Sequence, residues 1–384
     1  MSLLLSAILI ILEICRYLLV ELFFFRKKTN TTLSARDTIS VLQPLLSGDA
    51  ELWSNLRHNV TVDQNLNTEW IWLVDASDSN GLQGCRQLIN DFPNKKIRLV
   101  VCPAAPENVN PKVFKLNIGV RATQAKYIAV LDDDTMITPQ LLTESMATLK
   151  SEAADLVFGL PYYISKSTIW SRLVASFVNS SSLLSYIPYT FFLKPFTING
   201  MYYMTSRQTL VSNDVFKQIE NELCDDYAIA QFYSLRGLKL HQTPLLHPLN
   251  AKVESFSQFS KLLRRWFLFP MVSLIPQLSF HQLAVFLSSI LVPVFTMWTG
   301  ITLLITVPKT SARVSAFLLL LTKTGILALV NKRYLNNVDS VLSMVCMQLI
   351  TPLYILLALI GPREITWRDK RIKVLPSNKM RIIS

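Results

Sequence analysis

The sequence predicts an α/β domain with a doubly wound, mostly parallel sheet, embedded between an N-terminal and several C-terminal transmembrane helices. First, short apolar, β-branched runs alternate with helical stretches between residues 36 and 249, which is typical of a sheet with crossover helices. Second, apolar segments long enough to span a bilayer stand before and after this region. Third, 51% of the 384 residues are hydrophobic, and the mean hydropathy of +0.33 is too high for an ordinary soluble protein.

The charge and the cysteines limit the partners and the compartment. The net charge of +12 lies largely beside apolar runs, which favours an anionic membrane surface over a nucleic acid as its partner. The five cysteines are scattered, and the four histidines show no HxxH or HExxH spacing. We therefore expect no disulfide framework, no zinc site and no histidine-held metal, and a reducing compartment for the folded part.

Residues 2–25 form the first apolar segment, and Arg26-Lys27-Lys28 follows it at once. A signal peptide carries its charges before the apolar core, so residues 1–28 are interpreted as a retained anchor. The positive-inside rule then places the next domain on the cytoplasmic face. Glu13 and Arg16 lie one helical turn apart and could neutralise each other. The alternative is a helix that lies partly in the membrane interface.

The domain from 36 to 266 opens with a predicted strand at 38–42, which Gln43-Pro44 ends. The elements that follow are a helix at 49–59, strands at 70–74 and 97–102, a helix at 112–124 and a strand at 127–131. Two strands end in acidic residues, one in Asp75 and Asp78 and the other in Asp132, Asp133 and Asp134. On a parallel sheet both ends would face the same edge, where ligands of α/β folds bind.

The triplet Asp132-Asp133-Asp134 has two interpretations. As a pair at i and i+2, Asp132 and Asp134 can hold a hard divalent cation, Mn²⁺ or Mg²⁺, and leave its other positions to phosphate oxygens. Asp133 would then point to the other side of an extended backbone. The alternative is an acidic turn that only caps the helix expected to open at Thr138-Pro139.

Residues 169–196 are aromatic and aliphatic but interrupted by serines and prolines. This favours a membrane-facing flap or an amphipathic stretch, and a buried helix with its loop is the alternative. A strand is expected at 199–204.

A helix is predicted at 221–234, with Asp225 and Asp226 in its first turn. Acidic residues are favourable there, so a simple N-terminal cap is one interpretation of both. Adjacent helical positions point about 100° apart, so we expect only one of the two to face the sheet edge.

Residues 261–266, KLLRRW, place three cations beside a tryptophan. A membrane-interface anchor explains this composition, and so does a phosphate clamp, because arginine grips phosphate bidentately. An interfacial segment, 267–282, leads to membrane helices within 283–362, expected at 283–307, 314–330 and 338–360.

The basic tail, 363–384, should by its charge lie on the cytoplasmic face, like the domain. Three full spans after the domain would place the tail on the other side. We therefore expect that one apolar segment does not cross fully, and 314–330, which Lys323 interrupts, is the weakest candidate.

Taken in order, these motifs resemble the ceramide glucosyltransferase family of membrane-embedded glycosyltransferases. The family pattern is a first Asp, a D-x-D, a third Asp before a helix, and a (Q/R)xxRW motif ahead of membrane helices. The matching residues here are Asp75 or Asp78, Asp132 to Asp134, Asp226, and Arg265-Trp266. Further similar stretches are Leu42-Gln43-Pro44-Leu45, Asn110-Pro111-Lys112-Val113 and Ile365-Thr366-Trp367-Arg368. Leu262 departs from the pattern, because the family has Gln or Arg at that position.

The resemblance implies a GT-A-like fold and the inverting transfer of a single sugar, glucose first among the candidates, from a UDP-sugar to the hydroxyl of a ceramide-like membrane lipid. It implies Asp226 as the general base and Mn²⁺ or Mg²⁺ on Asp132 and Asp134. The residues that it implies for the nucleotide sugar are Asp75, Asp78, Lys112, Asp133 and Arg265. Trp266 would offer a flat apolar wall to the sugar or the acceptor.

Three other functions stay open at this point. A processive polysaccharide synthase carries the same ordered motifs, but it needs a bundle of spans for its channel, and three modest C-terminal spans are too few. The same chemistry could serve diacylglycerol, a hopanoid or a polyprenyl phosphate as acceptor. A non-catalytic lipid-binding membrane protein is the alternative from another class, which the loss of an essential carboxylate would favour, and none is lost.

Overall fold

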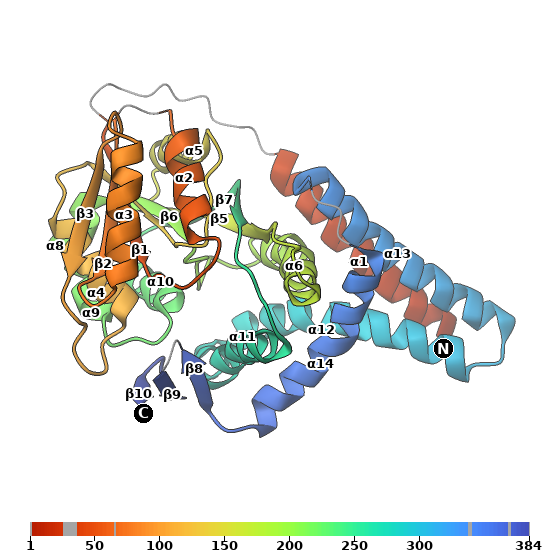
Figure 1. Cartoon of the computed structure of the whole chain (residues 1–384). Helices are drawn as coiled ribbons and strands as arrows, with labels where there is room; N and C mark the ends of the chain where they lie inside the picture. The colour runs from red at the N-terminus through yellow and green to blue at the C-terminus, as the bar shows by residue number, and fades with distance from the viewer. Residues whose placement is uncertain (1, 26–36, 65–66, 337–339, 368–369, 384) are drawn as a thin grey trace. The chain divides into compact units, whose positions relative to one another are not determined.

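A computed structural model describes residues 2–25, 37–64, 67–336, 340–367 and 370–383. The chain forms two compact units (Figure 1). One, the helical unit, comprises Met1–Lys27, Tyr162–Leu193 and Val253–Arg363, and the other, the α/β unit, comprises Lys28–Pro161, Lys194–Lys252 and Glu364–Ser384. Each is described by itself below. Arg26-Lys27-Lys28, on which the predicted sidedness of the anchor depends, lies outside the described residues.

The α/β unit is built on a seven-stranded sheet with the order β3-β2-β1-β4-β6-β5-β7. Its strands are β1 (Ile39–Leu45), β2 (Thr68–Asp75), β3 (Ile97–Cys102), β4 (Tyr127–Leu131), β5 (Leu156–Tyr163), β6 (Tyr202–Ser206) and β7 (Leu240–Leu249). The pairs β3-β2, β2-β1 and β1-β4 are parallel, whereas β6 runs antiparallel to both β4 and β5. The predicted mostly parallel, GT-A-like α/β class is confirmed.

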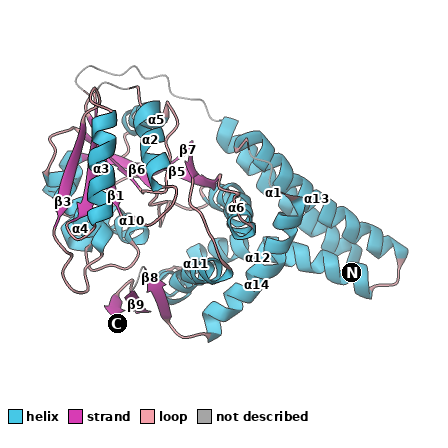
Figure 2. Cartoon of the chain, in the orientation of Figure 1, coloured by secondary structure: helices cyan, strands magenta, loops and turns pink. Residues whose placement is uncertain are grey.

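Helices cover both faces of this sheet (Figure 2). They are α2 (Leu52–Val62), α3 (Ser79–Asp91), α4 (Pro111–Arg121), α5 (Leu141–Ser151), α8 (Arg207–Ser212), α9 (Val215–Ile219) and α10 (Asp225–Leu235). One buried core joins one face of the sheet to α2, α3 and α5, and a second joins the other face to α4, α8, α9 and α10. Burial on both sides explains why β1 and β4 are apolar throughout most of their length.

Several predicted boundaries are wrong. The strand expected at 199–204 is β6, Tyr202–Ser206, and the helix expected at 221–234 is α10, Asp225–Leu235. The first strand does not end at Gln43-Pro44 but continues to Leu45, pairing Pro44 with Leu73 of β2. On the other side, pairing with β4 ends at Leu42, so no ladder bond there needs the amide that proline lacks. The helix expected from 49 begins at Leu52, and the one expected at Thr138-Pro139 begins at Leu141, because a turn precedes each of them.

The C-terminal tail forms a separate three-stranded antiparallel sheet within the α/β unit. Its strands are β8 (Glu364–Trp367), β9 (Lys370–Val374) and β10 (Met380–Ile382), in the order β10-β9-β8. The Nζ of Lys379 forms an ion pair with the carboxylate of Glu222 at 2.6 Å. The backbone amide of Leu223 donates to the carbonyl of Asn378 at 2.8 Å. The tail is thus joined to the loop that precedes α10.

Among the residues that the structure describes, four helices of the helical unit are long and apolar enough to cross a membrane, so the chain has the composition of a membrane protein. They are α1 (Ser2–Phe25), α12 (Phe280–Thr306), α13 (Thr310–Tyr334) and α14 (Val341–Ile360). Within α1, Glu13 and Arg16 form the expected ion pair at 2.8 Å. Glu13 also pairs with Lys323 of α13 at 3.2 Å, and both side chains are buried. The lysine that interrupts the predicted segment 314–330 is therefore paired.

Shorter helices complete the helical unit. They are α6 (Ile169–Ser181), a π-helical turn (Ser182–Tyr186), α7 (Ile187–Tyr189), α11 (Phe256–Phe269), a second π-helical turn (Pro270–Leu274) and a 3₁₀ turn (Ile275–Gln277). Helix α6 packs against α11 and α14. Its Asn179 accepts a hydrogen bond from the amide of Tyr163 and donates one to the carbonyl of the same residue. Of the two interpretations of residues 169–196, the structure supports the buried helix with its loop.

Candidate active site

The acidic ends of two strands meet at one edge of the sheet, as predicted. The loop after β1 connects them, because the amide of Leu46 donates to Asp133 Oδ2 at 3.1 Å and the amide of Ser47 donates to Asp78 Oδ2 at 2.8 Å. The carboxyl ends of β1, β2 and β4 therefore contribute to one site. We call this the acidic edge, comprising Asp75, Asp78, Asp132, Asp133, Asp134, Asp225 and Asp226.

Asp75 and Asp78 differ in the number of partners that their carboxylates have within the protein. Asp78 is the N-cap of α3, and it accepts hydrogen bonds from the amides of Gly81 and Ser47 and from the Ser47 hydroxyl. These bonds hold its pKa below the ordinary value despite partial burial. Asp75 instead pairs with the Nζ of Lys115 at 2.9 Å. Either residue could be the first Asp of the family pattern, and Asp75 has fewer hydrogen-bond partners within the protein than Asp78.

The triplet lies in a turn after β4, so the expectation of an extended backbone with alternating side chains is wrong. The three carboxylates have different partners. Asp132 Oδ1 pairs with the Nζ of Lys112 at 2.7 Å, Asp133 accepts from the Leu46 amide, and Asp134 Oδ1 accepts from the Thr135 hydroxyl at 3.2 Å. Burial and the neighbouring charges of Asp132 and Asp133 raise the pKa of Asp134 to about 7. Negative charge is thus concentrated at this turn.

Lys112 connects the triplet to α10. It is the second residue of α4, where Pro111 fits the first turn and the Asn110 side chain caps the helix by accepting from the amides of Lys112 and Val113. Its Nζ contacts Asp132 Oδ1 at 2.7 Å, Asp225 Oδ2 at 2.9 Å and the carbonyl of Gly200 at 3.2 Å. Burial alone would lower the pKa of this lysine, but the surrounding carboxylates raise it well above its ordinary value.

Asp225 and Asp226 are the first two residues of α10, and both reach the acidic edge. The expectation that only one of them would do so is wrong, because they meet different groups. Asp225 pairs with Lys112, while Asp226 packs against Gly200 and accepts a hydrogen bond from its backbone amide. The N-cap is Cys224, so the interpretation of Asp226 as a simple cap is not supported. Burial and the charge of Asp225 raise the pKa of Asp226 to about 7.

The acidic edge fits a divalent cation that is shared with a substrate. Within the described residues, no group of three or more His, Cys, Asp or Glu side chains is in position to hold a metal ion. A cation that one or two carboxylates and diphosphate oxygens coordinate does not need three protein ligands. Burial, and after it the charges of Asp132 and Asp133, raise the pKa of Asp134, and a cation at this turn would offset those neighbouring negative charges. Asp132 is already paired with Lys112, so Asp134 is the better placed of the two predicted ligands.

Arg265 and Trp266 lie on α11, in the helical unit. The Trp266 ring stacks on Phe177 with centroids 6.0 Å apart and meets Tyr163 edge-on at 6.4 Å. Neighbouring Arg264 donates to the carbonyl of Pro362 at 2.7 Å. Trp266 is therefore part of an aromatic cluster. An approach of Arg265 or Trp266 to a sugar nucleotide stays a prediction.

Two residues of this site were not predicted from the sequence. Lys115 is fully buried, and its Nζ donates to Asp75 and to the carbonyl of Leu45 at 2.8 Å. A lysine among the apolar positions Val113 and Leu116 of a predicted helix could have indicated it. Gly200 gave no such signal, because its role is to leave space for Asp226 in three dimensions.

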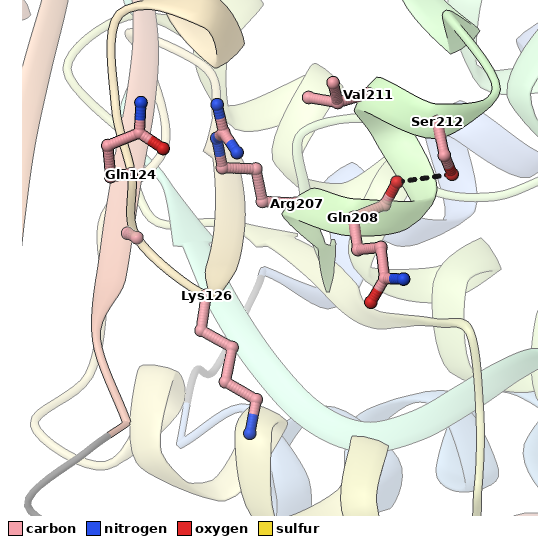
Figure 3. A pocket seen from close by; sticks show the side chains of 7 residues that line it. Gln124, Lys126, Arg207, Gln208, Val211 and Ser212 are labelled. Atoms are coloured by element: carbon pink, nitrogen blue, oxygen red, sulfur yellow. Dashed lines mark hydrogen bonds between the residues drawn. The ribbon is translucent and has the colours of Figure 1, made fainter.

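A shallow pocket lies at the opposite end of β4 from the triplet (Figure 3). It is lined by Gln124, Ala125, Lys126, Arg207, Gln208, Val211 and Ser212. Lys126 precedes the first residue of β4, whereas the triplet follows the last one. This pocket is therefore not part of the acidic edge.

Comparisons with known proteins agree with the geometry. Residues 5–380 match the model of the family described as Glycosyl transferase family 21. Among solved structures, a mannosyltransferase from Pyrobaculum calidifontis in complex with GDP-Man and Mn²⁺ is similar over 92% of this chain and 97% of its own, with a TM-score of 0.51 and 12% identity. At that identity the likeness shows the fold.

Two further solved structures are similar to this chain, with lower TM-scores. Staphylococcus aureus TarS 1-349 in complex with UDP-GlcNAc covers 90% of this chain and 99% of its own, with a TM-score of 0.40 and 10% identity. Glucosyl-3-phosphoglycerate synthase from Mycobacterium tuberculosis covers 61% and 80%, with a TM-score of 0.36 and 17% identity. No curated protein sequence matches the chain.

Proposed function

Because this chain belongs to glycosyl transferase family 21 and is a glycosyltransferase, we propose that it transfers a single glucose from UDP-glucose to the hydroxyl of a ceramide-like membrane lipid, with inversion at the anomeric carbon. The observation that carries the proposal is that Asp226 and the triplet lie at one edge of the sheet. Lys112 connects them, because it pairs with Asp132 of the triplet and with Asp225, the neighbour of Asp226. A base for the acceptor hydroxyl and a cation site for the leaving diphosphate are the two parts that the reaction needs.

Asp226 acts as the general base. The lipid hydroxyl oxygen attacks the anomeric carbon as its proton passes to Asp226, and the bond from that carbon to the diphosphate breaks, which releases UDP. A pKa of about 7 suits this role, because a base with a pKa near the working pH is both available and strong enough to accept the proton. Lys112 holds the neighbouring carboxylates of Asp132 and Asp225, and the Gly200 amide holds Asp226 where it can face the reacting hydroxyl.

The donor occupies the acidic edge. Asp75, with Asp78 behind it, receives the nucleoside, and Asp134 with Asp132 and Asp133 lies where the diphosphate would be. A Mn²⁺ or Mg²⁺ ion on Asp134 and Asp132 would neutralise the charge that develops on the leaving diphosphate. The complex of the Pyrobaculum mannosyltransferase with GDP-Man and Mn²⁺ supports both the donor class and the metal. Arg265 supplies a further cation to the diphosphate.

The acceptor comes from the bilayer. The helices of the helical unit support a membrane lipid as the substrate that Asp226 deprotonates. The aromatic cluster of Trp266, Phe177 and Tyr163 gives an apolar surface of the kind that an acyl chain or a sugar face contacts. We place the α/β unit on the cytoplasmic face, where UDP-sugars are available.

The test uses purified full-length protein in lipid nanodiscs, supplied with a panel of UDP-sugars and lipid acceptors. We expect mass spectrometry of the lipid fraction to show ceramide carrying one hexose, from UDP-glucose and not from the other donors. Ceramide should be preferred over diacylglycerol, a hopanoid and a polyprenyl phosphate. A ladder of oligosaccharides would instead support a processive synthase, and a product on another lipid would replace the acceptor.

A further inference from the structure

Asn378 of the C-terminal tail forms hydrogen bonds with Leu223 and Cys224, the two residues that precede Asp225 and Asp226. Its side-chain Oδ1 accepts from the amide of Cys224 at 2.9 Å, and its Nδ2 donates to the carbonyl of Cys224 at 2.9 Å. Its own carbonyl accepts from the amide of Leu223 at 2.8 Å. Three hydrogen bonds thus join one residue of the tail to a segment 154 positions away in the sequence.

The backbone conformation of Asn378 allows these hydrogen bonds. Asn378 is buried, and with φ of 62° it adopts the left-handed conformation, as does Ser377 before it with φ of 60°. Asparagine is one of the residues that accept this conformation. The turn is closed by the amide of Leu375, which donates to the carbonyl of Lys379 at 2.9 Å.

The same loop is also hydrogen-bonded to the N-cap of α4, the helix that carries Lys112. The Nδ2 of Asn110 donates to the carbonyls of Glu222 and Leu223, at 3.1 and 3.2 Å. Two asparagines, Asn110 and Asn378, therefore form hydrogen bonds with residues 222–224. Asn110 also caps the first turn of α4, from which Lys112 reaches Asp225.

We propose that Asn378 is a positioning residue for the candidate base, and that the tail is thereby a working part of the catalytic unit. Cys224 is the N-cap of α10 and provides no side-chain cap of its own, so the orientation of the first turn depends on its backbone partners. Asn378 supplies two of these partners. When they are lost, Asp226 moves away from the Gly200 amide and from the reacting hydroxyl. The inference rests on the proposed role of Asp226.

The test compares Asn378→Gly with Ser377→Gly in the full-length protein. Glycine at 378 keeps the left-handed backbone and the carbonyl that binds the Leu223 amide, but it removes both bonds to Cys224. Ser377 is exposed and shares the conformation, so it is the matched control. We expect kcat of Asn378→Gly to fall about 10-fold or more, with the KM for donor and the affinity for UDP nearly unchanged. Ser377→Gly should match wild type.

A second variant and a second measurement separate positioning from folding. In Asn378→Asp one oxygen still accepts from Cys224, so kcat should recover in part, and the added charge should shift the acidic limb of the kcat–pH profile to higher pH. Hydrogen–deuterium exchange over residues 222–228 should be faster in Asn378→Gly and unchanged in Ser377→Gly. This measurement needs no turnover, so it tests the hydrogen bonds of Asn378 to Cys224 even if ceramide is not the acceptor. Wild-type kcat or unchanged exchange in Asn378→Gly would overturn the inference.

Discussion

At the scale of single residues, the acidic edge depends on how closely carboxylates approach their partners. Lys112 contacts Asp132 and Asp225 within 2.9 Å, and the two acidic ends of the site would repel each other without it. Asp226 is held instead by a glycine, because any side chain at position 200 would occupy its place. The geometry of the base is therefore sensitive to a single methyl group.

Gly200→Ala tests this sensitivity. The added Cβ would lie 1.8 Å from Asp226 Oδ1, so the carboxylate must move. We expect kcat to fall by about 10²-fold, the scale of a displacement of about 1 Å at a reacting centre. Gly84→Ala is the control, since its Cβ would crowd Trp53 in the same unit. Equal kcat losses in the two variants would mean that crowding in general, and not the position of Asp226, lowers activity.

The pH dependence of kcat follows from the raised pKa of Asp226. The carboxylate is the active form, and its pKa is about 7, so the fraction able to accept a proton falls as the pH drops below that value. We expect kcat to fall about tenfold per pH unit on the acidic side. Steady-state rates from pH 5.5 to 8.5 would show it, and a flat profile down to pH 5.5 would argue against Asp226 as the base.

At the scale of elements, the turn after β4 sorts the three carboxylates into different roles. Asp133 accepts a backbone hydrogen bond from the β1 loop, and it ties two strand ends together. Asp132 and Asp134 are the pair proposed for the cation. The difference comes from the turn, which the alternation of an extended strand could not have described.

Substitutions in the triplet should therefore divide into two classes. In Asp133→Asn the amide oxygen can still accept from Leu46, so we expect a mild loss of activity. Asp132→Asn and Asp134→Asn should each lower activity and raise the Mn²⁺ or Mg²⁺ concentration that gives half-maximal rate, because a charged ligand is lost. Metal titrations of the three variants measure this. Equal damage from all three, or full activity in excess chelator, would contradict the assignment.

The elements also show what the sequence could and could not predict. The strands at 97–102 and 127–131 were predicted to the residue, because their runs are short, apolar and sharply bounded. Pro44 misled the prediction, since only the sheet order shows that the strand has one neighbour at that point. The hydrogen bonds between Asn378 and Cys224 could not be predicted from the sequence, because no local pattern connects residues so far apart.

At the scale of the whole molecule, the tail limits how the chain can cross a membrane. The tail belongs to the same compact unit as the acidic edge and is hydrogen-bonded to Cys224, which precedes Asp225, so both must lie on one side. In the sequence, helices α12, α13 and α14 come between the acidic edge and the tail, so an odd number of full membrane crossings would place the two on opposite sides. Lys323 was the reason to doubt α13, but it is paired with Glu13. Helix α14 is the shortest and packs against α6 and α11, so we expect α14 not to cross fully.

Cysteine accessibility tests this topology. In a variant free of native cysteines, Lys373→Cys places a thiol on the tail and Lys309→Cys places one between α12 and α13. We expect an impermeant maleimide to label position 373, and not position 309, in sealed vesicles with the cytoplasmic face outward. Labelling of 373 only from the opposite face would show that all three helices cross.

The central claim is that Asp226 deprotonates the acceptor, and turnover of Asp226→Asn measured beside UDP affinity tests it most directly. An amide cannot take the proton, so we expect kcat to fall by about 10²-fold or more while UDP still binds. Asp225→Asn is the control, because it weakens the pair with Lys112 and leaves the base in place, so its loss should be clearly smaller. An Asp226→Asn enzyme with near-normal kcat would show that another group is the base.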